Sequence, residues 1–237
     1  MSPIALVGGN EFRRECDPLD RALIELAGGT GVAVAILPTA ATNENPYVAG
    51  ENGVRHLRRL GARADKLMVT DEDDANAADF AGALVDFPFV YFTSGDPIYL
   101  HDTLRGSRVW QAVLAIHQRG GLVAGSSAGA MVLGEWLWRF DGWVPGLNLA
   151  PGLAVLPHHA TLAARWGGER MAASLPAGAT LVGVDEATAL LLPSLMVVGA
   201  GHVTIYGPDG PQAYPAGTQA ALPQQPALGA GPPAETS

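Results

Sequence analysis

The group in this sequence best suited to chemistry is a serine within a glycine-rich turn. Ser127 lies at the centre of Gly-Ser-Ser-Ala-Gly at 125–129, between the apolar runs at 121–124 and 130–133. This pattern predicts a strand, a sharp turn and a helix, which would raise the serine hydroxyl above a sheet. The backbone N–H of Ala128 would then be free to bind an oxyanion. The pattern is typical of a nucleophile elbow.

The pentapeptide alone is weak evidence, because small residues of this kind are common in turns. The apolar strand before it and the small residues after it strengthen the interpretation, since a helix must pack close to the strand. Ser126 is the competing hydroxyl. It occupies the variable position of the motif, so we assign it to local hydrogen bonding or to the wall of a pocket.

A serine hydroxyl becomes a strong nucleophile when a base, usually a histidine oriented by a carboxylate, removes its proton. His158 and His159 follow the predicted strand at 153–156. They would therefore lie near the carboxyl edge of the sheet, where sites of α/β proteins gather. The pattern leaves open which of the two is the base. The other histidines lie in or near helical patterns or begin a late strand: His56, His101, His117 and His202.

Four acidic residues are candidates for the carboxylate that orients the histidine. Asp141 lies between the serine and the histidines in the chain, and the alternatives are Glu135, Asp185 and Glu186. The order of such residues differs between folds, so order does not decide among them.

The segment at 93–97, Thr-Ser-Gly-Asp-Pro, predicts a turn at another strand end. Gly95 is the candidate for a second oxyanion donor, because such a donor comes from a neighbouring loop. The same turn would also cap a following helix. The first strand ends in Gly8-Gly9-Asn10, which lacks the spacing of a nucleotide-binding turn.

Short apolar runs alternate with amphipathic stretches over the first 140 residues, which indicates a single α/β domain with a mainly parallel sheet. Capping signals such as Asp17-Pro18, Asn45-Pro46 and Ser107 agree with this pattern. The expected strands are 4–7, 32–37, 66–69, 89–93 and 121–124. Later strands at 153–156, 180–184, 188–192 and 202–206 suggest hairpins appended to the sheet. We expect one domain at 1–214 and a disordered Pro/Gly/Ala/Gln-rich tail at 215–237.

Composition narrows the class of protein. The chain has 237 residues, 48% hydrophobic content and a net charge of -9, which suits one core and argues against nucleic acid or anionic membranes as partners. The single cysteine, Cys16, excludes an internal disulfide and suits the cytoplasm. The sequence has no signal-peptide pattern, no membrane-spanning run and no metal-ligand spacing. We therefore expect neither a metal nor a cofactor.

Several motifs together resemble the serine peptidase family of aspartyl dipeptidase and cyanophycinase, which has the class I glutamine amidotransferase-like fold. The resemblance runs from Val7 to about Tyr206. It implies a three-layer αβα sandwich of flavodoxin-like type with C-terminal hairpin strands. The motifs are Leu-Val-Gly-Gly at 6–9, Ile-Leu-Pro-Thr-Ala at 36–40, Phe-Thr-Ser-Gly-Asp-Pro at 92–97, the elbow, Pro157-His158 and Gly-Val-Asp-Glu-Ala-Thr-Ala at 183–189.

The resemblance implies Ser127 as nucleophile, His158 as base, and Gly95 and Ala128 as oxyanion donors. Asp141 is close to the dipeptidase position of the orienting acid. Glutamine amidotransferases have a cysteine at the elbow, whereas the only cysteine here is at position 16, so glutaminase activity is not expected.

Family members cleave peptide bonds after aspartate or the β-aspartyl-arginine link, which implies a small peptide substrate with an acidic group. Arg165 is the candidate cation, because a guanidinium pairs well with a carboxylate. We also expect His159 and Asp96 to contact substrate. Ser94 and the His158-His159 pair depart from the family pattern, and both departures fall in the expected substrate pocket.

The leading hypothesis is a metal-independent serine peptidase or amidase that acts through an acyl-enzyme. The alternatives are a catalytically inactive small-molecule-binding module on the same fold, or a serine esterase. A homodimer is compatible with all three.

Overall fold

A seven-stranded sheet forms the centre of the computed structural model, which describes residues 2–140 and 142–223. Its strand order is β11-β10-β1-β5-β4-β2-β3. Strands β3, β2, β4, β5 and β1 run parallel, and β10 and β11 are antiparallel additions. The bounds are β1 (Ile4–Val7), β2 (Ala33–Leu37), β3 (Arg63–Lys66), β4 (Phe89–Phe92), β5 (Leu122–Ser126), β10 (Thr188–Leu192) and β11 (Met196–Gly199).

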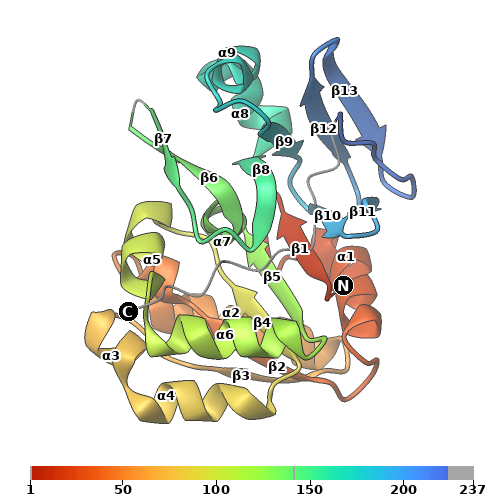
Figure 1. Cartoon of the computed structure of the whole chain (residues 1–237). Coiled ribbons are helices and arrows are strands. Elements are labelled where there is room, and N and C mark those ends of the chain that lie inside the picture. The colour runs from red at the N-terminus through yellow and green to blue at the C-terminus, as the bar shows by residue number, and fades with distance from the viewer. Residues whose placement is uncertain (1, 141, 224–237) are drawn as a thin grey trace.

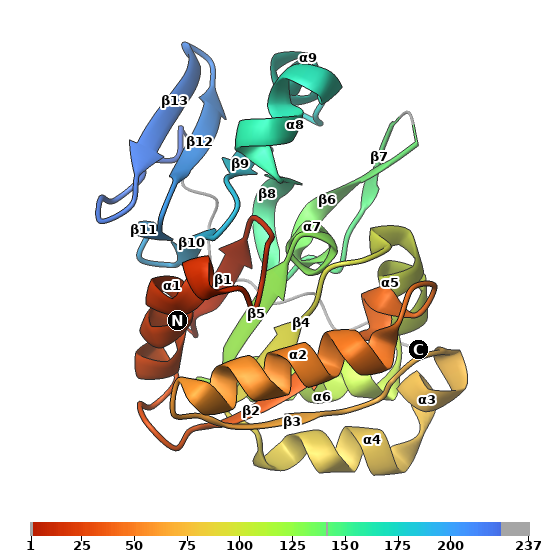
Figure 2. The ribbon, with the colours of Figure 1, turned by 180° about the vertical axis from the view of Figure 1, so that it is seen from behind.

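Helices cover both faces of this sheet, which confirms the predicted αβα arrangement (Figures 1 and 2). On one face, α1 (Asp17–Leu26) and α2 (Pro46–Arg59) pack their apolar sides on the buried strands. On the other face lie α5 (Pro97–Leu104) and α6 (Arg108–Gln118). The smaller helices are α3 (Glu72–Asn76) and α4 (Ala78–Ala83), with 3-10 turns at Arg14–Cys16, Thr39–Ala41 and Leu84–Asp86.

The third strand begins earlier than predicted. The sequence favours 66–69, but β3 spans Arg63–Lys66. It is an edge strand paired only with β2, so its polar side chains alternate with a buried alanine and give no apolar run. Val69 is buried in the segment that follows the strand.

The later strands include the expected hairpins, β10 with β11 and β12 with β13, but most of them form a second sheet rather than extend the first. Its order is β13-β12-β9-β8-β6-β7, and β8 runs parallel to both β6 and β9. Figure 1 shows it standing above the first sheet. The bounds are β6 (Gly134–Arg139), β7 (Gly142–Pro145), β8 (Ala150–Pro157), β9 (Thr180–Val184), β12 (His202–Gly207) and β13 (Gly210–Pro215). Helices α8 (His159–Trp166) and α9 (Gly168–Ala173) connect β8 to β9.

Ordered structure continues beyond the predicted start of the tail. The Val197 amide donates to the Thr218 carbonyl at 2.9 Å, and the Ala220 amide donates to the Leu195 carbonyl at 2.8 Å. Ala220 is buried, so this segment adds apolar contacts that its composition does not suggest. The rest of the predicted tail, 224–237, lies outside the described residues. No helix in the described part of the chain has the length and apolar character needed to cross a membrane.

Candidate active site

The elbow is formed as the sequence predicts. Strand β5 ends at Ser126, and α7 (Ala128–Leu133) begins directly after Ser127. Ser127 has φ 50° and ψ -108°, a backbone conformation that non-glycine residues seldom adopt outside functional turns. Its amide donates to the Val7 carbonyl at 2.9 Å, which ties the turn to β1. A Cβ on Gly129 would lie 2.7 Å from the Phe92 carbonyl oxygen, so the helix approaches β4 too closely for any larger residue.

His158 contacts the serine. It follows β8 with φ 133°, and its Nε2 lies 2.8 Å from Oγ of Ser127. The loop after β1 supports the other side of the ring, since a Cβ on Gly9 would lie 2.1 Å from Cε1 of His158. The ring nitrogen is therefore placed to accept the hydroxyl proton.

Glu186 lies on the far side of His158 from Ser127, so the three side chains form a row. Its Oε1 lies 3.5 Å from Nδ1 of His158, the ring nitrogen that faces away from Ser127. Oγ1 of Thr161 lies 2.7 Å from the same Oε1 and 2.9 Å from the His158 carbonyl oxygen, and its single proton is shared between these two acceptors. The threonine thus joins the glutamate to the backbone of the histidine. This arrangement suits a carboxylate that orients an imidazole and stabilises its positive charge.

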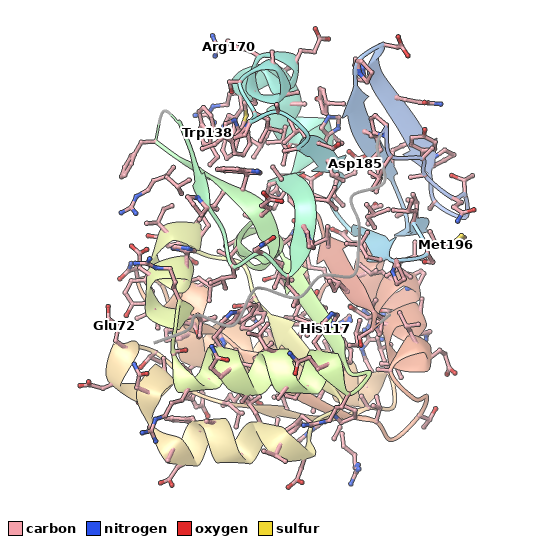
Figure 3. All side chains as sticks on the ribbon, in the orientation of Figure 1. Glu72, His117, Trp138, Arg170, Asp185 and Met196 are labelled. Carbon is pink, nitrogen blue, oxygen red and sulfur yellow. The ribbon has the colours of Figure 1, made fainter. Side chains whose placement is uncertain are left out.

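No other candidate carboxylate lies within 4.0 Å of a His158 nitrogen among the described residues. Asp141 lies outside the described residues. Glu135 belongs to β6 rather than to the elbow helix, and it accepts a hydrogen bond from the Gly152 amide at 2.6 Å. Asp185 lies 3.5 Å from Nδ1 of both His159 and His202. Figure 3 labels Asp185 where the second sheet meets the first.

The sequence names the backbone amides of Ala128 and Gly95 as the candidate oxyanion donors. Ala128 is the first residue of α7, and Gly95 lines the same cavity as His158. Neither amide donates to a protein acceptor among the residues that the structure describes. Both groups are thus available for a ligand oxygen.

The remaining predicted substrate residues do not meet at this cavity. Nε2 of His159 lies 2.8 Å from the Tyr206 hydroxyl, on the second sheet. Asp96 caps α5 by accepting hydrogen bonds from the Ile98 and Tyr99 amides, and it lines another cavity with acidic neighbours. Arg165 is exposed on α8 and lines no part of the cavity beside His158.

That cavity, of about 780 Å³, instead contains arginines that the sequence analysis does not single out. Arg13 and Arg14 line it from the loop after β1, and Arg55 and Arg59 line it from α2. Arg59 forms a two-pronged pair with Asp17, at 2.7 and 2.6 Å. The other three have no carboxylate within 4.0 Å in the described part of the chain. The sequence gives one signal for these arginines: Arg55 and Arg59 are four residues apart, which places them on the same face of a helix.

The comparison with known families settles the class. The model described as peptidase family S51 matches residues 4–194, which is most of the chain. The chain belongs to peptidase family S51. This confirms the resemblance to the aspartyl dipeptidase and cyanophycinase family, and it makes the protein a serine peptidase.

Individual relatives agree with the family. The chain is 25% identical over 219 residues to a cyanophycinase from Geminocystis herdmanii, with 86% of this chain and 80% of the relative covered. A peptidase from an acI-B1 Actinobacterium is 30% identical with a TM-score of 0.82, covering 92% of this chain and 96% of its own. A putative peptidase E from Listeria monocytogenes EGD-e is 19% identical with a TM-score of 0.63, covering 84% and 97%, and shares the fold. The predicted fold class is thereby confirmed.

Proposed function

We propose that the protein hydrolyses an aspartyl or β-aspartyl peptide bond in a small peptide, through an acyl-enzyme and without a metal ion. The observation that carries this proposal is the 2.8 Å contact between Nε2 of His158 and Oγ of Ser127. The contact joins the Ser127 hydroxyl, at the apex of the elbow, to a base that can remove its proton.

In the proposed reaction His158 takes the Ser127 proton as Oγ attacks the substrate carbonyl carbon. The carbonyl oxygen becomes an oxyanion held by the amides of Gly95 and Ala128. When the carbon–nitrogen bond breaks, His158 gives the proton to the departing amine and the acyl group stays on Ser127. A water molecule then gives a proton to His158 as its oxygen attacks the ester carbonyl carbon. His158 returns this proton to Oγ of Ser127 as the ester carbon–oxygen bond breaks, which releases the acid and restores the free serine.

We assign the third role to Glu186 rather than to Asp141. The 3.5 Å approach of Oε1 to Nδ1 supports this choice, because a carboxylate there favours the tautomer that leaves Nε2 free to accept a proton. Thr161 would hold the carboxylate in place while the imidazole gains its charge.

The arginines support an acidic substrate. Arg13, Arg14 and Arg55 give the catalytic cavity three guanidinium groups without carboxylate partners among the described residues, in a chain whose net charge is -9. A guanidinium binds a carboxylate through two parallel hydrogen bonds. We propose that one of these groups, in place of Arg165, receives the acidic side chain or the carboxyl terminus of the peptide.

The test is a substrate panel of α-aspartyl dipeptides, β-aspartyl dipeptides, their asparaginyl counterparts and simple esters. We expect hydrolysis of an aspartyl peptide that survives a chelator and disappears in Ser127→Ala. We also expect Arg55→Ala to raise KM for that peptide about tenfold, with the exposed Arg21→Ala as control. Activity on esters alone, or equal rates for aspartyl and asparaginyl peptides, would contradict the proposal.

A further inference from the structure

Glu11 joins three segments of the active site. It lies in the loop after β1, where its Oε1 accepts a hydrogen bond from the Ser94 amide at 2.8 Å. Its Oε2 accepts hydrogen bonds from the hydroxyl groups of Ser94, at 2.5 Å, and Ser126, at 2.9 Å. One carboxylate therefore bridges the β1 loop, the β4 loop and the last residue before the nucleophile.

Each of these segments carries a part of the proposed machinery. The β1 loop presses Gly9 against the ring of His158, the β4 loop carries Gly95, and Ser126 is followed by Ser127. Ser126 is fully buried, so its hydroxyl donates inward rather than into solvent. The local hydrogen bonding expected of Ser126 thus has a specific acceptor.

The bonds to Glu11 bear most directly on the Gly95 amide. On one side of it, the Ser94 amide is held by Glu11. On the other side, the Asp96 amide donates to the Ala40 carbonyl at 2.8 Å. The Gly95 amide lies between these two fixed groups and has no protein acceptor in the described part of the chain. Gly95 has φ 144°, a conformation that a flexible glycine loop can leave readily unless its neighbours are held.

The donors to Glu11 are all neutral. No lysine or arginine nitrogen lies within 4.0 Å of its carboxylate among the described residues. Its hold on the loops therefore depends on directional hydrogen bonds, which fix orientation more narrowly than an ion pair between flexible side chains does. The negative charge of a carboxylate near the oxyanion would oppose catalysis. Any increase in rate due to Glu11 must therefore come from the way it orients the neighbouring backbone amides.

We propose that Glu11 is a positioning residue that holds the Gly95 amide toward the carbonyl oxygen attacked by Ser127. The proposal rests on the proposed function, because it assigns a cause to the placement of one oxyanion donor. Removal of Glu11 would let the Ser94–Gly95 peptide rotate, so the transition state would lose a hydrogen bond that the bound substrate does not yet need.

The test compares Glu11→Ala, Glu11→Gln and the exposed control Glu25→Ala. For Glu11→Ala we expect kcat to fall about ten- to a hundredfold with KM nearly unchanged, less than the 10²–10³ typical of losing an oxyanion donor outright. A peptide aldehyde, which forms a tetrahedral adduct with the serine, should bind more weakly by the same factor as kcat/KM falls. Glu11→Gln can still accept from the Ser94 amide, so we expect it to recover most of kcat.

The outcomes separate this proposal from the proposed function. If the wild-type protein hydrolyses no peptide and forms no adduct at Ser127, the proposed function fails. If it does both, and Glu11→Ala keeps its kcat or loses activity wholly through KM, Glu11 does not position the donor. Should Glu11→Ala fail to fold, Glu11→Met, which fills a similar volume without an acceptor for the Ser94 amide, decides the question. Unchanged kcat and unchanged aldehyde binding in folded Glu11→Met would overturn the proposal.

Discussion

His158 and Ser127 are 31 positions apart in the chain, yet Nε2 of the histidine lies 2.8 Å from the serine Oγ. The contact joins the two sheets of the molecule. Ser127 follows β5 of the first sheet, and His158 follows β8 of the second. The proposed chemistry therefore depends on how these sheets pack together as well as on the elbow motif.

Replacing Glu186 by glutamine should lower kcat by about 10²- to 10⁴-fold. The amide can still accept the Thr161 hydrogen bond, but it cannot stabilise the charged imidazole. The measurement is kcat on the best aspartyl peptide, with Asp141→Asn and Glu135→Gln assayed beside it. A large loss in Asp141→Asn with little change in Glu186→Gln would return the role to Asp141.

Replacing Gly9 by alanine should displace the histidine. The new Cβ would lie 2.1 Å from Cε1 of His158, so the ring must move away from Ser127. We expect kcat to fall at least about a hundredfold, since small misplacements of reacting groups have effects of this size. Gly31→Ala is the matched control, because Gly31 also has positive φ but has nothing within 4 Å of the added Cβ. Equal losses of activity in both variants would point to backbone strain rather than to the ring contact.

The stability of the folded protein should depend on the ionisation of Asp185, and therefore on pH. Burial opposes ionisation of Asp185, but hydrogen bonds from His159 and from the His202 amide outweigh it and hold the pKa of Asp185 below its usual value. Such a carboxylate stabilises the fold above the unfolded-state pKa of about 4, and this contribution is lost as pH falls through the lower folded value.

Accordingly, Asp185→Asn should lower the free energy of unfolding by about 2 kcal/mol at pH 7, and the difference from wild type should shrink below pH 4. Urea unfolding at several pH values measures it, with the exposed Asp209→Asn as control. A difference that stays constant down to pH 2 would be evidence against an ionised Asp185 in the folded protein.

Cys16 should be unreactive in the folded protein. Burial raises the pKa of its thiol to about 12, and the negative charge of Asp20 adds to the effect. We expect no alkylation by iodoacetamide at pH 8 and no loss of peptidase activity, with full alkylation in urea. Rapid alkylation of the native protein would show that the Cys16 region opens readily.

The sequence predicts the residues whose roles depend on local structure. Ser127 and His158 each follow a buried strand, and the apolar run with its turn marks both positions. Helix caps at Asn45 and Ser107 are likewise predicted, because each side chain bonds an amide three residues later.

Glu186 and the arginines depend on contacts that the sequence does not display. Strands β8 and β9 are parallel, and their register places Pro157 beside Val184. The residues that follow each strand, His158 and Glu186, are therefore neighbours. The close spacing of the later strands suggests hairpins instead, which hides this pairing. Arg13 and Arg55 come together only when α2 packs beside the loop after β1.

The most direct test of the account is covalent labelling of the intact protein with a fluorophosphonate probe, followed by mass spectrometry of the labelled peptide. We predict a single adduct on Ser127 that blocks hydrolysis and is absent from Ser127→Ala. We further predict that His158→Ala labels much more slowly. An adduct on Ser126 or Ser94, or equal labelling of wild type and Ser127→Ala, would contradict the assignment of Ser127 as the nucleophile.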